Sequence, residues 1–188
     1  RGYNVVMMTD LRKSPSELMD ITWAELEPHY IRLEAAELTA ETLRQWLSDW
    51  NDLNAASEEA SSRIYVATSV NTEDSEAEAR LERYVDEIYP KVKTAEQALK
   101  SKLLKSGLSL PEIEIPLKKL EAETSIFKPE NLPLQSEESK LGVEYDKILG
   151  AQAIEWEGKT TTLAGLGKVY HDSDREKRQK AWEAEMGR

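Results

Sequence analysis

The chain has 188 residues, a net charge of −11 and no cysteine. Its length suits one domain or slightly more, and the lack of cysteine excludes disulfides and thiolate metal sites. The acidic balance argues against nonspecific nucleic-acid binding and against docking to an anionic membrane, and no segment reaches the ~20 apolar residues that span a bilayer.

Three helices are predicted in the first half of the chain. Residues 1–21 are mixed in character and are predicted to be irregular or a short strand. Thr22 and Glu25 have the spacing of a capping box, which predicts a helix that ends near Leu38 and tolerates Pro28 close to its first turn.

The second predicted helix begins at a Thr39 cap and ends before Asn71. Its apolar residues recur at steps of three and four, which places them on one face. The residues that define this stripe are Leu43, Trp46, Leu47, Trp50 and Leu53.

A turn at residues 72–74 leads to the third predicted helix, with a kink at Pro90 and an end at Gly107. Two long helices joined by a short turn predict an antiparallel helical hairpin. The apolar residues of the third helix are Leu81, Tyr84, Val85, Ile88, Val92, Leu99 and Leu103.

Prolines divide the chain after this hairpin. Pro111 and Pro116 are predicted to bracket a loop, and residues 117–127 are predicted to form a helix. Pro129 and Pro133 mark a second break. Ser136 is then predicted to cap a helix that continues to Leu149 and is loosened by Gly150.

The last part combines a small hairpin with a final helix. Alternation in residues 153–156, a turn at Glu157 and Gly158, and a threonine-rich segment predict a β-hairpin near residues 153–162. Gly165 and Gly167 are expected to loosen the next segment. The final helix is predicted to begin at a capping box of Ser173 and Glu176 and to leave an exposed apolar patch around Trp182.

The sequence therefore predicts an all-α fold in which a long antiparallel helical hairpin, residues 1–108, precedes a compact helical part, residues 109–188, with one small β-hairpin.

The sequence contains no recognisable catalytic motif. H-E-x-x-H, the Walker loop, G-x-S-x-G and G-x-G-x-x-G are all absent. His29 and His171 are the two histidines. Either could act as a metal ligand or an acid–base group, but ordinary packing or exposure is the favoured interpretation of both. Asp172 and Asp174 near His171 are explained by helix capping. We predict no catalytic, cofactor-binding or metal-binding residues in this chain.

Other clusters are also interpreted as structural. The carboxylate pairs Glu58–Glu59 and Glu137–Glu138 are assigned to solvated helix faces, because neighbouring helical positions diverge. Glu112 and Glu114 are assigned to a loop. Two further expectations concern larger side chains: a core role, rather than a peptide cradle, for Trp23, Trp46 and Trp50, and a carboxylate partner for Arg63.

Several segments, in order along nearly the whole chain, resemble the oligoendopeptidase F group of thimet-like zinc metallopeptidases. They include the opening helix from Trp23 and the end of the hairpin near Gly107. The most informative is EYDKILGAQAIEWEG, Glu144 to Gly158. The others are Leu47 to Trp50, Arg63 to Val66, Asn71 to Asp74, Asn131 to Leu134, and Asp174 to Arg178 with Ala181 and Trp182.

The resemblance implies that residues 1–188 are an N-terminal helical domain that walls a channel for short peptide substrates in a cytoplasmic peptidase. It places the zinc, with H-E-x-x-H and a later glutamate, in a C-terminal catalytic domain of the same polypeptide, beyond residue 188. The chain alone is then expected to be inactive. Two rivals stay open: a freestanding helical protein-interaction module, and a complete enzyme with an unrecognised carboxylate site.

Overall fold

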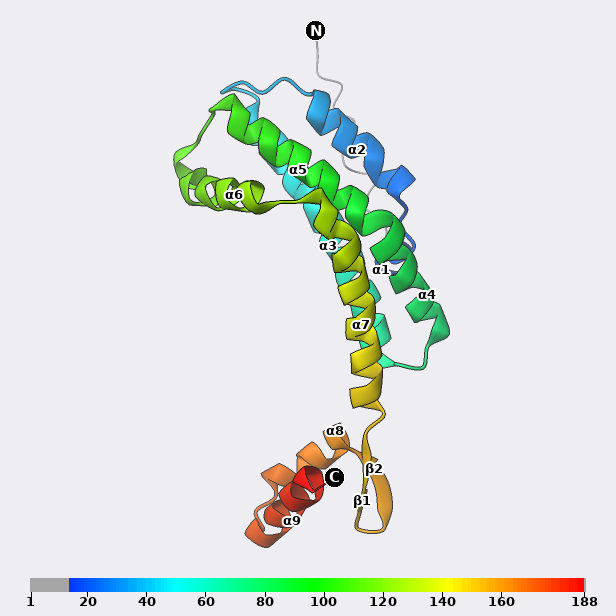
Figure 1. Cartoon of the computed structure of the whole chain (residues 1–188). Helices are drawn as coiled ribbons and strands as arrows, with labels where there is room; N and C mark the ends of the chain where they lie inside the picture. Colours follow the sequence, from blue (N-terminus) through cyan, green and yellow to red (C-terminus); the bar gives the residue numbers. More distant parts are fainter. Residues whose placement is uncertain (1–13, 188) are drawn as a thin grey trace. The chain divides into compact units, whose positions relative to one another are not determined.

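The computed structural model describes residues 14–187, and the prediction for residues 1–13 lies outside this range. Contacts between Cα atoms divide the chain into two compact units, whose boundary falls inside helix α7, between Lys140 and Leu141. The expected boundary at residue 108 lies within the first unit. The all-α class is confirmed, with one small antiparallel sheet (Figure 1).

The first unit consists of helices and short helical turns. In chain order these are α1 (Pro15–Leu18), α2 (Trp23–Ala35), α3 (Leu43–Val70), α4 (Ser75–Arg83), the π-helical turn η2 (Tyr84–Ile88), α5 (Tyr89–Ser106), the 3-10 turn η3 (Pro111–Ile113), α6 (Glu114–Ile126), the 3-10 turn η4 (Pro129–Asn131) and the start of α7 (Leu132–Gly150).

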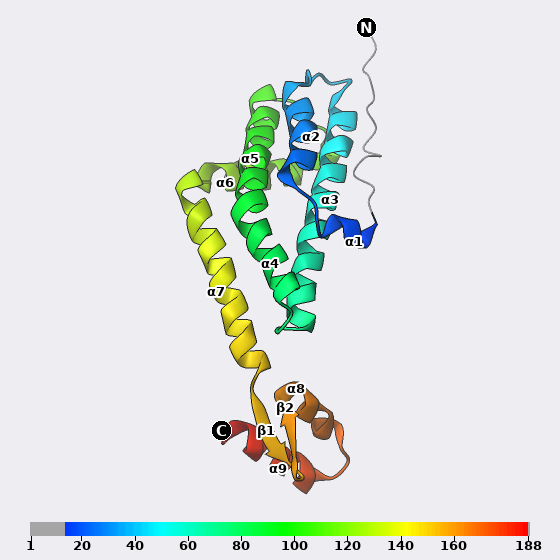
Figure 2. The ribbon, with the colours of Figure 1, turned by 90° about the vertical axis from the view of Figure 1, so that its right-hand side faces the viewer.

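The predicted helical hairpin is confirmed. Helix α3 runs antiparallel to the continuous helix α4–η2–α5, and α2 packs against α3 and α5 (Figure 2). Gly107 ends the second arm with φ 66°, a left-handed conformation that glycine adopts readily. The buried side chains follow the predicted stripes on both arms; on α3 they are Leu43, Trp46, Trp50, Leu53, Ser57, Ala60, Ile64 and Thr68.

The helix starts follow from side-chain caps. Thr22 and Glu25 form the predicted capping box, with the Thr22 N–H 2.8 Å from the Glu25 carboxylate. Residues 15–18, predicted to be irregular or a strand, form α1 instead, because Ser14 and Glu17 make a second capping box. The short spacing Ser-x-x-Glu, with proline at the first helical position, was the local signal for this helix.

The C-terminal end of α2 is tied to both arms of the hairpin. The Leu33 carbonyl accepts a hydrogen bond from Trp46 Nε1 of α3 at 2.9 Å and another from Lys102 Nζ of α5 at 3.1 Å. Lys102 also donates to the carbonyls of Glu34 and Ala36. These donors satisfy carbonyl groups that a helix end leaves without partners.

Pro90 has a different effect from the predicted kink. The helix continues through Tyr89 and Pro90, but one π-helical turn precedes them, in which the Tyr89 N–H donates to the Tyr84 carbonyl five residues back. Pro90 has no N–H for the Val85 carbonyl. That carbonyl instead accepts a hydrogen bond from the buried Ser136 hydroxyl of α7, at 2.6 Å.

The predictions around the later prolines were partly wrong. Pro116 lies inside the first turn of α6, and Pro133 in the first turn of α7, where a missing N–H costs nothing. Glu114 accordingly begins a helix rather than belonging to a loop. Ser136 is not a cap, because α7 begins four residues earlier and the hydroxyl serves Val85.

The second unit, considered by itself, contains the predicted β-hairpin. Strands β1 (Ala153–Trp156) and β2 (Lys159–Thr162) pair antiparallel, with Trp156 opposite Lys159. Glu157 and Gly158 between them have φ values of 51° and 76°. Positive φ at both turn residues matches the right-handed twist of the strands.

The rest of this unit is helical. It contains α8 (Leu163–Leu166), the 3-10 turn η5 (Gly167–His171) and α9 (Arg175–Met186). The expected loosening at Gly165 and Gly167 was wrong, since both lie in helical turns and Thr162 caps α8 through the Gly165 N–H at 3.1 Å. Asp174, rather than Ser173, caps α9.

Replacement of Ser136 tests the bond to the π-helical turn. Ser136→Ala leaves the buried Val85 carbonyl without its donor, and we expect a loss of about 1–3 kcal/mol in the free energy of unfolding, measured with urea. Ser139→Ala is the matched control, because that hydroxyl bonds the Gln135 carbonyl of its own helix. Equal stability of the two variants would contradict the assignment.

Candidate functional site

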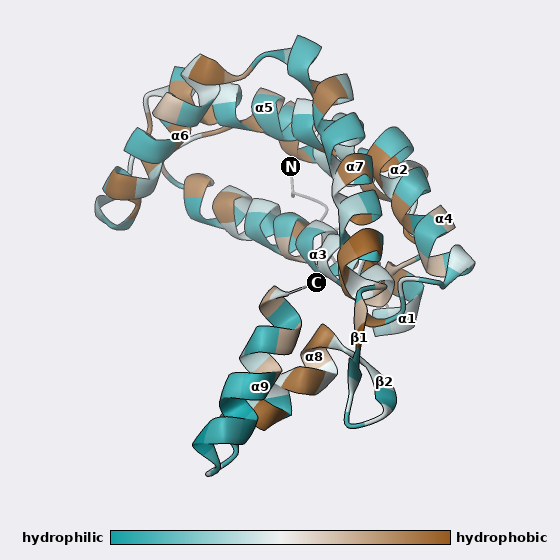
Figure 3. Cartoon of the chain, turned by 60° about the horizontal axis from the view of Figure 1, so that its bottom comes forward, coloured by the Kyte–Doolittle hydropathy of each residue, from teal (hydrophilic) through white to brown (hydrophobic). Residues whose placement is uncertain are grey.

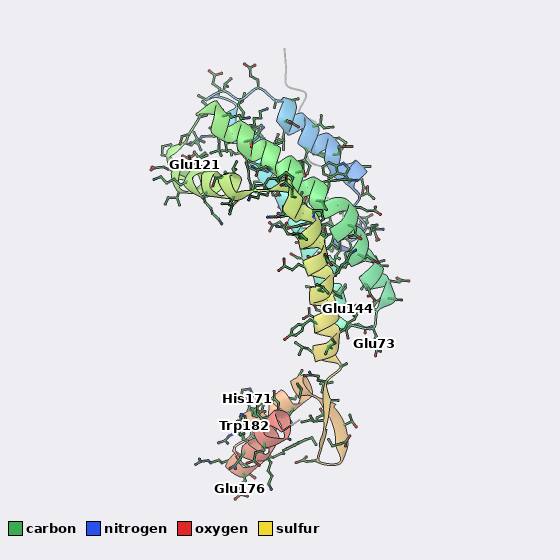
Figure 4. The ribbon with its side chains drawn as sticks, viewed as in Figure 1. Glu73, Glu121, Glu144, His171, Glu176 and Trp182 are labelled. Atoms are coloured by element: carbon green, nitrogen blue, oxygen red, sulfur yellow. The ribbon has the colours of Figure 1, made fainter. Side chains whose placement is uncertain are left out.

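The two histidines belong to different units of the chain. His29 is buried in α2, with 8% of its surface exposed. His171 is exposed at the end of η5, where Figure 4 labels it. Among residues 14–187, no three His, Cys, Asp or Glu side chains come together in a way that could hold a metal ion. The residues of the described range therefore do not fit a zinc site.

The acidic cluster beside His171 organises the start of α9. Asp172 Oδ1 accepts a hydrogen bond from the Asp174 N–H at 3.0 Å, and Asp172 Oδ2 pairs with Lys177 at 3.3 Å. The backbone N–H of Asp174, followed by Lys177, lowers the pKa of Asp172. Asp174 in turn accepts from the N–H groups of Glu176 and Lys177. The carboxylates are thus engaged in capping.

The tryptophans lie where a core role predicts them. Trp46 and Trp50 are buried, with ring centroids 5.2 Å apart, and Trp23 is half-buried and stacked on Tyr30 at 5.7 Å. Arg63 has the expected carboxylate partner, because its Nε lies 2.6 Å from Glu59.

Exposed apolar residues mark two surfaces in the second unit. On α7, Leu141, Tyr145 and Ile148 recur at steps of four and three and are each at least 60% exposed. The ribbon of α7 carries hydrophobic stretches, coloured brown in Figure 3. On α9, Trp182 is 55% and Met186 is 60% exposed. The predicted exposure around Trp182 is confirmed. Apolar surface of this kind is typical of a site for a partner.

A polar cavity of ≈ 230 Å³ lies in the first unit between α3 and the second arm of the hairpin. Sequence reasoning did not find it, because its walls come from separate helices. Ser57, Ser61, Tyr84, Lys93 and Glu96 are among the residues that line it. Burial raises the pKa of Tyr84 to about 12, Ser61 offsets part of that rise, and the Glu96 charge adds to it.

No helix within residues 14–187 is both long and apolar enough to cross a membrane.

The fold and its uncovered surfaces define a helical domain without a metal centre among its described residues. Comparison with known families gives its class: the model of the Peptidase M3 N-terminal domain matches residues 17–111. The chain belongs to this family.

A solved structure supports the same fold. The structure titled "PZ peptidase A with inhibitor 2" is 22% identical to this chain and superposes with a TM-score of 0.66. The alignment covers 94% of this chain and 31% of that chain, so the chain spans about a third of this relative's length. No curated protein matches the sequence.

The buried tyrosine predicts a pH dependence of stability. The Tyr84 pKa is raised above the value of about 10 in an unfolded chain. The folded state therefore keeps a proton that the unfolded state has lost, and stability falls as the pH rises from about 10 towards 12, by roughly 2–3 kcal/mol. Urea unfolding across this range measures the fall.

Tyr84→Phe should make this fall shallower without abolishing it, because one ionisable buried hydroxyl is removed while Tyr30, whose pKa is also raised by burial, remains. Tyr145→Phe, at an exposed position of α7, is the control and should retain the fall. A Tyr84→Phe profile as steep as that of the unmodified protein would refute the explanation.

Proposed function

We propose that this chain is the non-catalytic N-terminal domain of a zinc-dependent oligoendopeptidase that hydrolyses short peptides. The observation that carries the proposal is the match to the Peptidase M3 N-terminal domain, which covers the helical hairpin. The relative in the solved structure, three times longer, supports a larger parent protein. Zinc, with the residues that bind it, would belong to a catalytic domain of the same polypeptide.

The role proposed for the helices is to form part of the wall of the substrate channel. A wall needs elements that keep their shape, and the hairpin has an apolar core along both arms together with the ties from Trp46 and Lys102 to α2. Enclosure by such a wall would admit short unfolded peptides and exclude folded proteins. The family resemblance of residues 144–158 supports an F-type parent, and a sequence without cysteine suits the cytoplasm.

The apolar surfaces of α7 and α9 are proposed to contact the catalytic domain. Leu141, Tyr145 and Ile148 expose a stripe along one helix, and Trp182 exposes an indole ring of the kind enriched at the centres of interfaces. Residues 1–188 are accordingly assigned to a single N-terminal domain of the larger peptidase.

Hydrolysis of a quenched fluorescent peptide tests the proposed division of labour. The 188-residue chain alone should show no hydrolysis. A longer polypeptide from the same reading frame that contains H-E-x-x-H should hydrolyse the peptide and lose this activity with a chelator. Chelator-sensitive hydrolysis by the 188-residue chain alone would overturn the proposal. A reading frame without H-E-x-x-H would instead favour the freestanding interaction module.

Ile148→Asp tests the proposed contact of α7. The position is 64% exposed, so the free energy of unfolding should change by no more than about 0.5 kcal/mol. Affinity for a separately produced catalytic domain, measured by calorimetry, should fall about tenfold or more, because a charge would be buried in an apolar contact. Glu144→Gln, on the same helix, is the control. Undiminished affinity of Ile148→Asp would remove α7 from the interface.

A further inference from the structure

The polar cavity between α3 and the second arm of the hairpin has a floor of buried hydroxyl groups. Ser57 is 4% exposed, and its hydroxyl has no hydrogen-bond partner among the described residues. Tyr30, a residue of α2 that is 3% exposed and does not line the cavity, also has a hydroxyl without a hydrogen-bond partner among residues 14–187. Ser57 lies close enough to Tyr30 to offset part of the rise that burial causes in the pKa of the phenol, although their geometry is not that of a hydrogen bond. Buried polar atoms without partners are uncommon in folded proteins.

The cavity is larger than one water molecule requires. Its ≈ 230 Å³ compares with roughly 10–15 Å³ for a single water. Glu58 and Ser62 at its edge are exposed, whereas Ser57 and Tyr84 are buried, so the hydroxyl groups are reached from a solvated rim. A small polar group can enter without displacement of the core.

The charges of the lining favour a cation. Glu58 and Glu96 contribute two carboxylates, and Lys93 contributes the single positive charge. The Glu96 side chain is only 13% exposed and lies 3.3 Å from Lys93 Nζ. Its negative charge is felt by another lining residue, since it raises the pKa of Tyr84.

The Lys93 side chain shows that this wall accommodates an ammonium group. Its Nζ lies 5.5 Å from the centroid of the Tyr89 ring, in a cation–π arrangement, and it also pairs with Glu96. The Glu58 carboxylate and the Ser57 hydroxyl line the same cavity, as does the Ser61 hydroxyl, which also interacts with Tyr84 and has a second lone pair to offer. An ammonium group has three N–H donors and no acceptor, which matches this set.

We propose that the cavity is a binding site for a primary ammonium group, with Ser57, Ser61 and Glu58 as its acceptors. The same chemistry is offered by the amino terminus of a short peptide and by a lysine side chain. This site lies within the hairpin that is proposed to form the channel wall, but its existence does not depend on the proposed function.

NMR titration of the 15N-labelled 188-residue chain tests the site with three probes. Trialanine carries a free amino terminus, N-acetyl-trialanine has it blocked, and Nα-acetyl-lysine amide offers only a side-chain ammonium. Saturable shifts at cavity residues are expected with trialanine, with the lysine amide or with both, and none with N-acetyl-trialanine. Trialanine alone would assign the site to amino termini, and the lysine amide alone to side chains.

Three variants make the test specific. Ser57→Ala and Glu58→Gln should each weaken binding of the active probe about tenfold, because each loses a hydrogen bond to a charged group. Ser48→Ala, at an exposed position on the same helix, should bind as the unmodified protein does. Glu58 is exposed, so its variant keeps the test valid if Ser57→Ala fails to fold.

Two results would overturn the proposal. The first is equal shifts with the blocked and unblocked peptides, or no shifts with any probe, which would mean that the cavity holds water only. The second is undiminished affinity in both Ser57→Ala and Glu58→Gln.

Discussion

The hydrogen bond from Ser136 to the Val85 carbonyl ties α7 to the second arm of the hairpin. It exists because Pro90 offers no N–H and the π-helical turn directs the Tyr89 N–H to Tyr84 instead. The buried carbonyl needs a donor from another element, and α7 supplies it. The ion pair of Lys140 with Asp86, at 2.6 Å, lies one helical turn further along. Together these bonds fix where α7 begins relative to the hairpin.

Sequence patterns were sufficient to predict the helices and turns that are determined by residues close together in the chain. The α3 stripe, the Thr22–Glu25 box, the end at Gly107 and the two-residue turn at Glu157 and Gly158 are all specified within a few residues. The errors arose where a distant partner decides. Serine is a residue type that often caps helices, but the Ser136 hydroxyl donates instead to the carbonyl of Val85, 51 residues away in the sequence. The capping box at Ser173 failed by one residue, because Asp174 is an equally good cap and lies closer to the helix.

The candidate sites also divide into those that the sequence could predict and those that depend on contacts between distant residues. The lack of a zinc motif could be read from the sequence, because such a motif is a short pattern on one helix. The exposed surface around Trp182 could be predicted from the apolar residues of the last helix. The polar cavity could not, since Ser57 and Ser61 resemble ordinary helix residues until Tyr84 and Glu96 are packed beside them. Its formation requires the correct register between two arms that follow each other in sequence through the turn at residues 71–74.

That short turn also orders the events of folding. Contacts between α3 and α4 join residues close in sequence, so the loop that must close to form them is small and its entropic cost is low. Ser136 must close a loop of 51 residues to reach Val85. The hairpin can therefore form early, while the nascent chain is still lengthening, with its π-helical carbonyl hydrated until α7 is synthesised and replaces that water.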